Sequence, residues 1–177
     1  MPWLEPVTLE GPHARLEPLS HDHRDALVDA VKDGDLWKLW YTFVPAPEKM
    51  GAEIERRLSL QSSGAMLPFT VRDADGKIAG MTTYMNVDAA NRRVEIGSTW
   101  YAKRVQRSAL NTQCKLLLLA HAFEKLDCIA VEFRTHFFNH ASRRGSSSEK
   151  ARLARPAIGH RRRKTFLRRS KPARQFV

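Results

Sequence analysis

A long apolar helix, predicted over residues 112–126, restricts the fold of this chain more than any other segment. Its apolar side chains recur at helical spacing and form one wide stripe: Leu116, Leu117, Leu119, Ala120, Phe123 and Leu126. A stripe of this width indicates that the helix is buried against a sheet. Strands are predicted directly before the helix, over 93–101, and directly after it, over 129–135. The order strand, loop, buried helix, strand predicts a βαβ-like unit.

The segment before this unit predicts an antiparallel meander. Residues 66–72 alternate as a strand, the turn residues Asp73-Ala74-Asp75-Gly76 follow, and residues 78–87 form the returning strand. A second turn at 88–91 leads into the strand at 93–101. Three consecutive antiparallel strands therefore precede the helix.

The first sixty residues predict two short extended pieces and three helices. The extended pieces lie within 7–19, and Ser20 is expected to cap a helix that runs to about Lys32. Further helices are expected over 36–42 and 48–60. Taken together, the elements predict an α+β (mixed α/β) fold, in which a mixed sheet combines the N-terminal antiparallel meander with the βαβ-like unit.

Charge is distributed unevenly along the 177 residues, a length typical of one domain. Residues 145–177 hold 11 Lys and Arg against a single acidic residue, whereas residues 1–144 hold 19 Lys and Arg against 18 Asp and Glu. Low hydrophobicity combined with high net charge predicts disorder. We therefore expect a folded domain over 1–144 and a disordered basic tail over 145–177.

Location and metal binding are predicted mainly from features that the sequence lacks. Neither a signal peptide nor a run of about 18 apolar residues is visible. Two cysteines, Cys114 and Cys128, are too few for a disulfide framework. These features predict a cytoplasmic protein without a membrane partner. His21 and His23 have no further ligand nearby in the sequence, so no metal site is expected.

The loop between the predicted strand at 93–101 and the helix is polar and basic. A helix N-terminus offers free backbone N–H groups and the positive end of the helix dipole, and both attract anions. Lys103, Arg104 and Arg107 add positive charge beside them. The loop has no glycine, which excludes a Walker-type loop and a dinucleotide fingerprint. The alternatives are a phosphate or pyrophosphate site and a plain connection with solvated basic side chains.

Four local segments resemble the GNAT acyltransferases, in particular the branch that includes the ribosomal-protein N-terminal acetyltransferases. Residues 94–101 (VEIGSTWY) are similar to the family's central strand, and 106–111 (QRSALN) occupy the place of its acyl-CoA loop. Residues 121–126 (HAFEKL) resemble the end of the helix that follows the loop, and 139–144 (NHASRR) resemble the start of the next helix. Within the loop, Ala109 replaces the first family glycine, and Asn111 occupies a Gly/Ala position.

The resemblance implies an acetyl-CoA-dependent N-acetyltransferase, with acetyl-CoA as co-substrate and a primary amine as acceptor, either a protein N-terminus or a small molecule. It places the pyrophosphate on the loop and helix start, and the pantetheine arm between the two diverging strands. The cofactor-binding residues implied are Ser98, Thr99, Gln106, Arg107, Ser108, Ala109, Leu110, Asn111, Thr112 and Asn139.

Two residues are implied in the chemistry. Glu95 is the candidate for accepting the amine proton, and Ser142 is the candidate for a hydrogen bond to the CoA sulfur. Alternation along the strand places Ser98 on the face of Val94 and Ile96, and Glu95, Gly97 and Thr99 on the other face. The alternatives are that Glu95 is an ordinary strand residue and that Asn139 and Ser142 only cap a helix.

The family pattern stops after Arg144, where two more strands would be expected. The Arg-rich sequence beyond Arg144 has two explanations. It is either a genuine basic arm that binds nucleic acid or an out-of-frame continuation of the gene. The second explanation predicts an enzyme that lacks its last strands and whose activity is impaired. The alternative function is a non-enzymatic nucleic-acid-binding protein that acts through the tail. A third possibility is a relative that keeps the fold without the chemistry.

Overall fold

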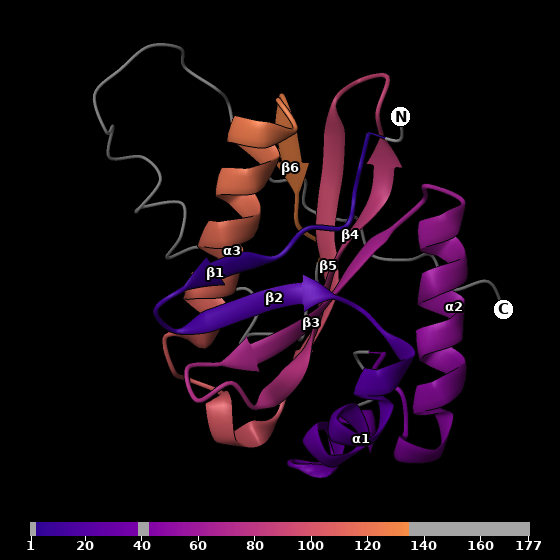
Figure 1. The fold of residues 1–177 in the computed structure, drawn as a ribbon, viewed down its shortest axis with the longest axis vertical. Coiled ribbons are helices and arrows are strands. Elements are labelled where there is room, and N and C mark those ends of the chain that lie inside the picture. The colour runs from indigo at the N-terminus through magenta and orange to yellow at the C-terminus, as the bar shows by residue number, and fades with distance from the viewer. Residues whose placement is uncertain (1–2, 39–42, 135–177) are drawn as a thin grey trace, which may run out of the picture.

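A six-stranded sheet forms the centre of the molecule (Figure 1). The computed structural model describes residues 3–38 and 43–134. The strands are β1 (Leu9–Gly11), β2 (Ala14–Pro18), β3 (Leu67–Asp73), β4 (Ile78–Asp88), β5 (Arg93–Tyr101) and β6 (Ala130–Glu132). They lie side by side in sequence order, antiparallel up to β5, while β6 runs parallel to β5. The predicted α+β fold, with its meander and its parallel βαβ-like unit, is confirmed.

Helices cover both faces of this sheet. On one face, α1 (Arg24–Lys32) packs against β4, and α2 (Met50–Ser62) packs against β3 and α1. On the other face lies α3 (Leu110–Ala120), which contacts β1 and β2. Neighbouring residues of β4 show the division, because Thr83 accepts a hydrogen bond from Arg57 of α2, whereas the hydroxyl of Tyr84 donates to the carbonyl of Leu118 in α3.

Short 3-10 turns accompany the helices of the first half. They span His21–His23, Leu36–Lys38 and Pro47–Lys49, and a fourth, Lys103–Val105, follows β5. Ser20 caps the first turn, since its hydroxyl accepts from the amide of Asp22, and the helix ends at Lys32 as predicted. The helix expected over 36–42 is confirmed only as the 3-10 turn, because residues 39–42 lie outside the described residues.

The position and rotation of α3 differ from the prediction. The helix begins at Leu110, two residues early, and after Ala120 it continues as a π-turn over His121–Lys125. Leu118 is buried, whereas Ala120 is exposed and Leu116 and Leu117 are only half-buried. Four consecutive leucines at 116–119 leave the rotation of the helix undetermined in the sequence, so contacts with the sheet decide which of them point inward.

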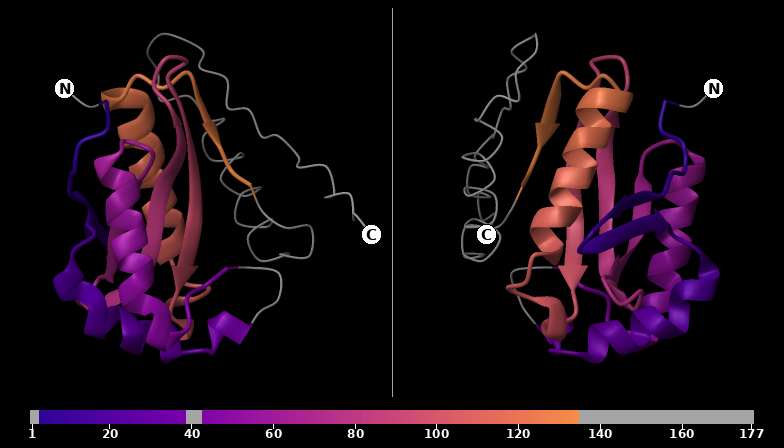
Figure 2. Two further views of the ribbon diagram at one scale, coloured as in Figure 1. Left: turned by 90° about the vertical axis from the view of Figure 1, so that its right-hand side faces the viewer. Right: turned by 60° about the vertical axis from the view of Figure 1, so that its left-hand side comes forward.

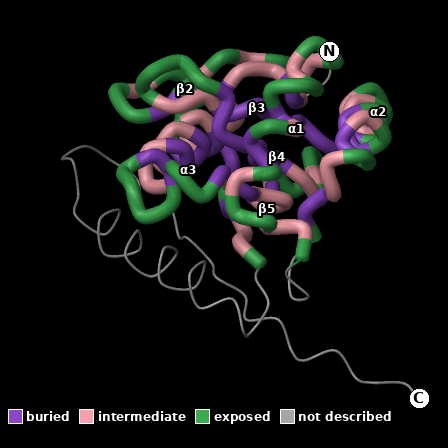
Figure 3. The backbone as a smooth tube through the Cα atoms, turned by 90° about the horizontal axis from the view of Figure 1, so that it is seen from below, coloured by how far each residue is buried: buried purple, intermediate pink, exposed green. Residues whose placement is uncertain are grey.

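Buried residues concentrate in the middle strands and on the inward sides of the helices (Figure 3). β6 has three residues, fewer than the predicted 129–135. Within 3–38 and 43–134, none of the helices has the length and apolar character needed to cross a membrane. The same residues contain no cluster of three or more His, Cys, Asp or Glu that could bind a metal. The predictions for 145–177 and for strands after Arg144 lie outside the described residues.

Candidate active site

The central strand β5 is interrupted by a bulge at Ser98. Thr83 of β4 pairs with Gly97 and Met81 pairs with Trp100, so β5 has one residue more than β4 in this interval. Ser98 absorbs the extra residue with a φ of 48°, in the left-handed region that few residues other than glycine adopt. The bulge lies in the strand that the sequence singled out for the acyl donor.

The parallel pairing of β5 with β6 stops just before this bulge. The two strands pair only at Arg93 with Ala130, Val94 with Val131 and Glu95 with Glu132. β6 ends at the last of these pairs, and both views of Figure 2 show its described end spreading away from β5. Residues 97–99 of β5, beyond the last pair, are half-buried, whereas residues 94–96 are buried.

Ser98 and Thr99 are both half-buried and point to opposite faces of the sheet. The hydroxyl of Ser98 lies 3.6 Å from the Sδ atom of Met85, and that of Thr99 lies 2.8 Å from the hydroxyl of Thr82. Met85 pairs directly with Glu95, so Ser98 lies on the face of Glu95. The predicted alternation grouped Ser98 with Val94 and Ile96, and Thr99 with Glu95. Both assignments are wrong, because the bulge shifts the alternation by one residue.

The loop from Gln106 to Ala109 is exposed and held by its own side chains. Gln106 donates to the carbonyl of Tyr101 at 3.0 Å, and Arg107 has a φ of 61°. The hydroxyl of Ser108 donates to the carbonyl of Val105 at 2.6 Å and accepts from the amide of Leu110 at 3.3 Å. These bonds fix the path of the loop into α3.

The first turn of α3 presents unpaired amides toward this loop. The first hydrogen bond of the helical pattern runs from the backbone amide of Gln113 to the carbonyl of Ala109, at 2.9 Å. Among the described residues, none accepts from the amides of Asn111 or Thr112. Ala109 has a φ of −68°, which any residue adopts. The backbone conformation at this position therefore does not require the glycine that the family has there. The helix start is suited to an anion.

The three basic side chains near the loop differ in their availability. Arg104 forms an ion pair with Asp73 and donates to the carbonyl of Ile78 at 3.0 Å, so its guanidinium is turned to the β3–β4 turn. The prediction that Arg104 lies beside the anion site is therefore wrong. Lys103 and Arg107 are exposed, and Arg107 lies within the loop itself.

Glu95 is 5% exposed, and the described residues hold only one of its two carboxylate oxygens. Its Oε2 atom accepts a hydrogen bond from the side-chain amide of Asn86 at 2.8 Å and lies 3.1 Å from Nε of Arg134. No described residue donates to Oε1, which faces Gly97, where an added Cβ would lie 3.3 Å away. One carboxylate oxygen is thus anchored while the other borders the half-exposed Gly97.

Two predicted residues, Asn139 and Ser142, lie outside the described residues. The partners of Glu95 were not predicted. Asn86 has a φ of 48° and forms a second bulge, opposite β5, and Arg134 also pairs with Glu132 at 3.1 Å. An asparagine inside a long strand is a weak signal of such a bulge, because asparagine adopts the left-handed region more readily than most residues.

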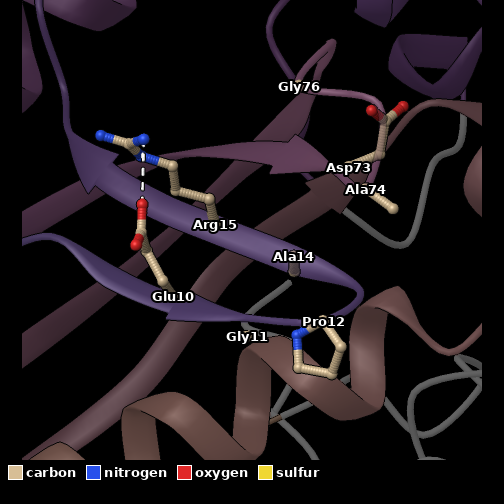
Figure 4. Close-up of a pocket in the computed structure, with 8 residues that line it drawn as sticks. All are labelled: Glu10, Gly11, Pro12, Ala14, Arg15, Asp73, Ala74 and Gly76. Carbon is tan, nitrogen blue, oxygen red and sulfur yellow. Dashed lines mark ion pairs between the residues drawn. The ribbon is translucent and has the colours of Figure 1, made fainter.

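A separate cavity of about 370 Å³ lies between the β1–β2 turn and the β3–β4 turn (Figure 4). An ion pair between Arg15 and Glu10, 2.9 Å long, lies at its wall. The lining residues are Glu10, Gly11, Pro12, Ala14, Arg15, Asp73, Ala74 and Gly76. Because none of them is a predicted site residue, we place the candidate site at β5, β6 and the start of α3.

Known proteins resemble this chain in sequence and in fold. The family model of the acetyltransferase (GNAT) domain matches residues 13–146. A GCN5-related N-acetyltransferase from Brucella melitensis is 32% identical, with 82% of this chain and 67% of that chain covered and a TM-score of 0.70. A protein classed as an acetyltransferase from T. thermophilus is 28% identical, with 82% and 76% covered and a TM-score of 0.71.

More distant structures share the fold. RimL, a ribosomal L7/L12 α-N-protein acetyltransferase, is 16% identical, with 82% of this chain and 80% of that chain covered and a TM-score of 0.72. Another RimL structure contains coenzyme A. A comparison with curated protein sequences gave no match. The matched domain extends over more than half of the chain, and the chain therefore belongs to the GNAT acetyltransferase family, enzymes that use acetyl-CoA as acetyl donor.

Proposed function

We propose that this enzyme transfers the acetyl group of acetyl-CoA directly to a primary amine at the divergence of β5 and β6. The observation that carries the proposal is this divergence, with the bulge at Ser98 on one side of it and the exposed loop into α3 at its end. The pyrophosphate binds at Arg107 to Thr112, and the pantetheine arm extends along Ser98 and Thr99.

Direct transfer is favoured over a covalent enzyme intermediate. Burial raises the pKa of the Cys114 thiol to about 12, so it stays protonated and is a poor nucleophile. Cys128, the other cysteine of the chain, is also buried. In the direct reaction the amine nitrogen bonds to the thioester carbonyl carbon, the C–S bond breaks, and coenzyme A leaves as the thiolate.

Glu95 is the proposed general base in this reaction. Attack requires a neutral amine, and the amine proton passes through a water molecule to Oε1, the oxygen that borders Gly97. The hydrogen bond from Asn86 and the ion pair with Arg134 hold the carboxylate in place through Oε2. Ser142 and Asn139 retain their proposed roles at the CoA sulfur and the pantetheine arm, which the family resemblance implies.

The acceptor is proposed to be either a protein N-terminus or a small amine. A protein with the same fold modifies the N-terminal serine of 50S ribosomal subunit protein L7/L12 in Salmonella typhimurium. An acceptor panel should therefore begin with peptides that carry a free N-terminal serine and extend to other N-termini and to polyamines.

The test is turnover of acetyl-CoA with this panel by the full chain and by Glu95→Gln. We expect Glu95→Gln to lose turnover by about 10²- to 10⁴-fold, the usual contribution of a general base, while it keeps its affinity for acetyl-CoA. Glu132→Gln is the matched control, since Glu132 pairs with Glu95 in the sheet and shares Arg134. Equal losses in both variants would remove the base role from Glu95.

A second function, nucleic-acid binding, is favoured by the charge of residues 145–177. It predicts RNA binding whose log K falls with log salt, with a slope of roughly −0.7 to −0.9 per phosphate contact. Deletion of 145–177 should abolish this binding, and acetyl-CoA should not change it. RNA affinity that survives the deletion would rule out this second function.

A further inference from the structure

A buried arginine connects α2 to the bulge of β5. Arg57 is 1% exposed, and its guanidinium reaches from α2 across β4 to β5. Nε donates to Glu53 at 2.7 Å, Nη1 donates to the hydroxyl of Thr83 at 2.6 Å, and Nη2 donates to the carbonyl of Ser98 at 3.3 Å. A single side chain thus links a helix, a strand and the residue that forms the bulge.

The charge balance of this group is provided within α2. Burial alone would raise the pKa of Glu53, but hydrogen bonds from Arg56 and Arg57 outweigh it and hold the pKa below its usual value. Glu53 therefore stays ionised and compensates the buried guanidinium. The bonds to Thr83 and Ser98 are not required for that compensation, which suggests a role in holding the sheet.

The hydrogen bond from Arg57 to the Ser98 carbonyl is made to the residue that forms the bulge. A bulge disrupts the ladder locally, and a residue other than glycine at a φ of 48° needs surrounding contacts to keep it there. Arg57 donates to the carbonyl of that residue, and Thr83, its acceptor on β4, pairs with the neighbouring Gly97. The guanidinium therefore restrains the bulge from both strands.

We propose that Arg57 is a positioning residue, which fixes the β5 bulge and thereby the backbone that contacts the pantetheine arm and thioester of acetyl-CoA. This inference rests on the proposed function, in which the donor lies along Ser98 and Thr99. Arg57 acts only through the bulge, whereas the loop at the start of α3 binds the nucleotide end of the donor independently of it.

The test compares two ligands on the full chain by isothermal titration. Acetyl-CoA contacts both the bulge and the loop, while adenosine 3′,5′-diphosphate lacks the pantetheine arm and reports on the nucleotide end alone. We expect Arg57→Met to weaken acetyl-CoA binding on the order of 10-fold, because small displacements of positioning groups have effects at least this large. The affinity for adenosine 3′,5′-diphosphate should stay unchanged.

Arg57→Lys keeps the charge beside Glu53 and serves if Arg57→Met does not fold. A lysine lacks the planar fork that reaches three acceptors, so we expect an acetyl-CoA affinity between wild type and Arg57→Met. The matched control is Arg56→Met, because Arg56 pairs with the same Glu53 at 2.8 Å but is about half-exposed and, among the described residues, has no hydrogen bond or ion pair to β4 or β5. Its affinity for both ligands should equal that of wild type.

Three results would overturn the inference: wild-type acetyl-CoA affinity in Arg57→Lys, equal losses for both ligands, or the same loss in Arg56→Met. The first would show that only the charge matters, and the second that the variant perturbs the whole domain. A wild-type chain that binds neither ligand would overturn the proposed function and this inference with it.

Discussion

Two buried ionic side chains, Glu95 and Arg57, lie on the same face of the sheet on either side of Gly97. Glu95 is on β5 beside Met85, and Arg57 contacts Thr83, two residues from Met85 on β4. Burying a charge is costly unless partners compensate it, and each of the two has at least two such partners. We interpret Glu95 as the group that handles the proton and Arg57 as the group that maintains the backbone.

At the residue scale, His23 predicts a pH dependence of stability. Its Nδ1 atom lies 2.9 Å from the hydroxyl of Thr70, and its Nε2 atom lies 3.2 Å from Glu17. Burial lowers the pKa of His23 below 6.5, although Glu17 opposes this shift. The unfolded chain therefore binds the proton more readily, so stability should be constant above about pH 7 and fall as the pH decreases below 6.5.

Urea denaturation from pH 8 to pH 5 measures this effect. Burial also lowers the pKa of His121, so His23→Gln should reduce the pH dependence without removing it. His21→Gln is the matched control, because His21 is an exposed neighbour in the same 3-10 turn. A pH dependence that His23→Gln leaves unchanged would show that His23 does not carry it.

At the element scale, the approach of β4 to β5 depends on Gly80. Gly80 has a φ of 155°, and an added Cβ would lie 2.1 Å from the carbonyl oxygen of Trp100. Gly64, which follows α2, has a φ of 76° but nothing within 4 Å of the corresponding position. Gly80→Ala must therefore displace a strand, whereas Gly64→Ala only strains its own backbone.

We expect Gly64→Ala to lower the free energy of unfolding by about 1–2 kcal/mol. Gly80→Ala should lower it by more than about 4 kcal/mol, a loss typical only of severe clashes. Chemical denaturation of the two variants beside wild type measures the difference. Similar losses in both would mean that β4 and β5 tolerate a side chain at Gly80.

Local chemistry made most elements predictable from the sequence. The turn at Asp73–Gly76 and the cap at Ser20 depend on neighbouring residues, and the structure contains both. The bulge at Ser98 was not predictable, because the pairing with adjacent strands decides it, and the bulge at Asn86 left only the weak signal of an asparagine within a strand. For the same reason the sequence indicated Glu95 but not the side chains that hold it.

At the scale of the whole molecule, the two faces of the sheet carry different parts of the candidate site. Glu95 and Arg57 share the face covered by α1 and α2, while α3 lies on the other face and directs its N-terminus to the loop at 106–109. The donor is thereby proposed to bind at one end of α3 and to react near Glu95. The central claim is that the start of α3 holds the pyrophosphate of acetyl-CoA.

Titration of acetyl-CoA into the full chain and into Ala109→Glu and Ala109→Gln tests this claim most directly. Ala109 is exposed, and a carboxylate at a helix N-terminus does not destabilise the helix. We predict that wild type binds acetyl-CoA and that Ala109→Glu binds at least about 10-fold more weakly than Ala109→Gln, because like charges repel at short range. Equal affinities of Ala109→Glu and Ala109→Gln, or a wild-type chain that does not bind acetyl-CoA, would contradict the account.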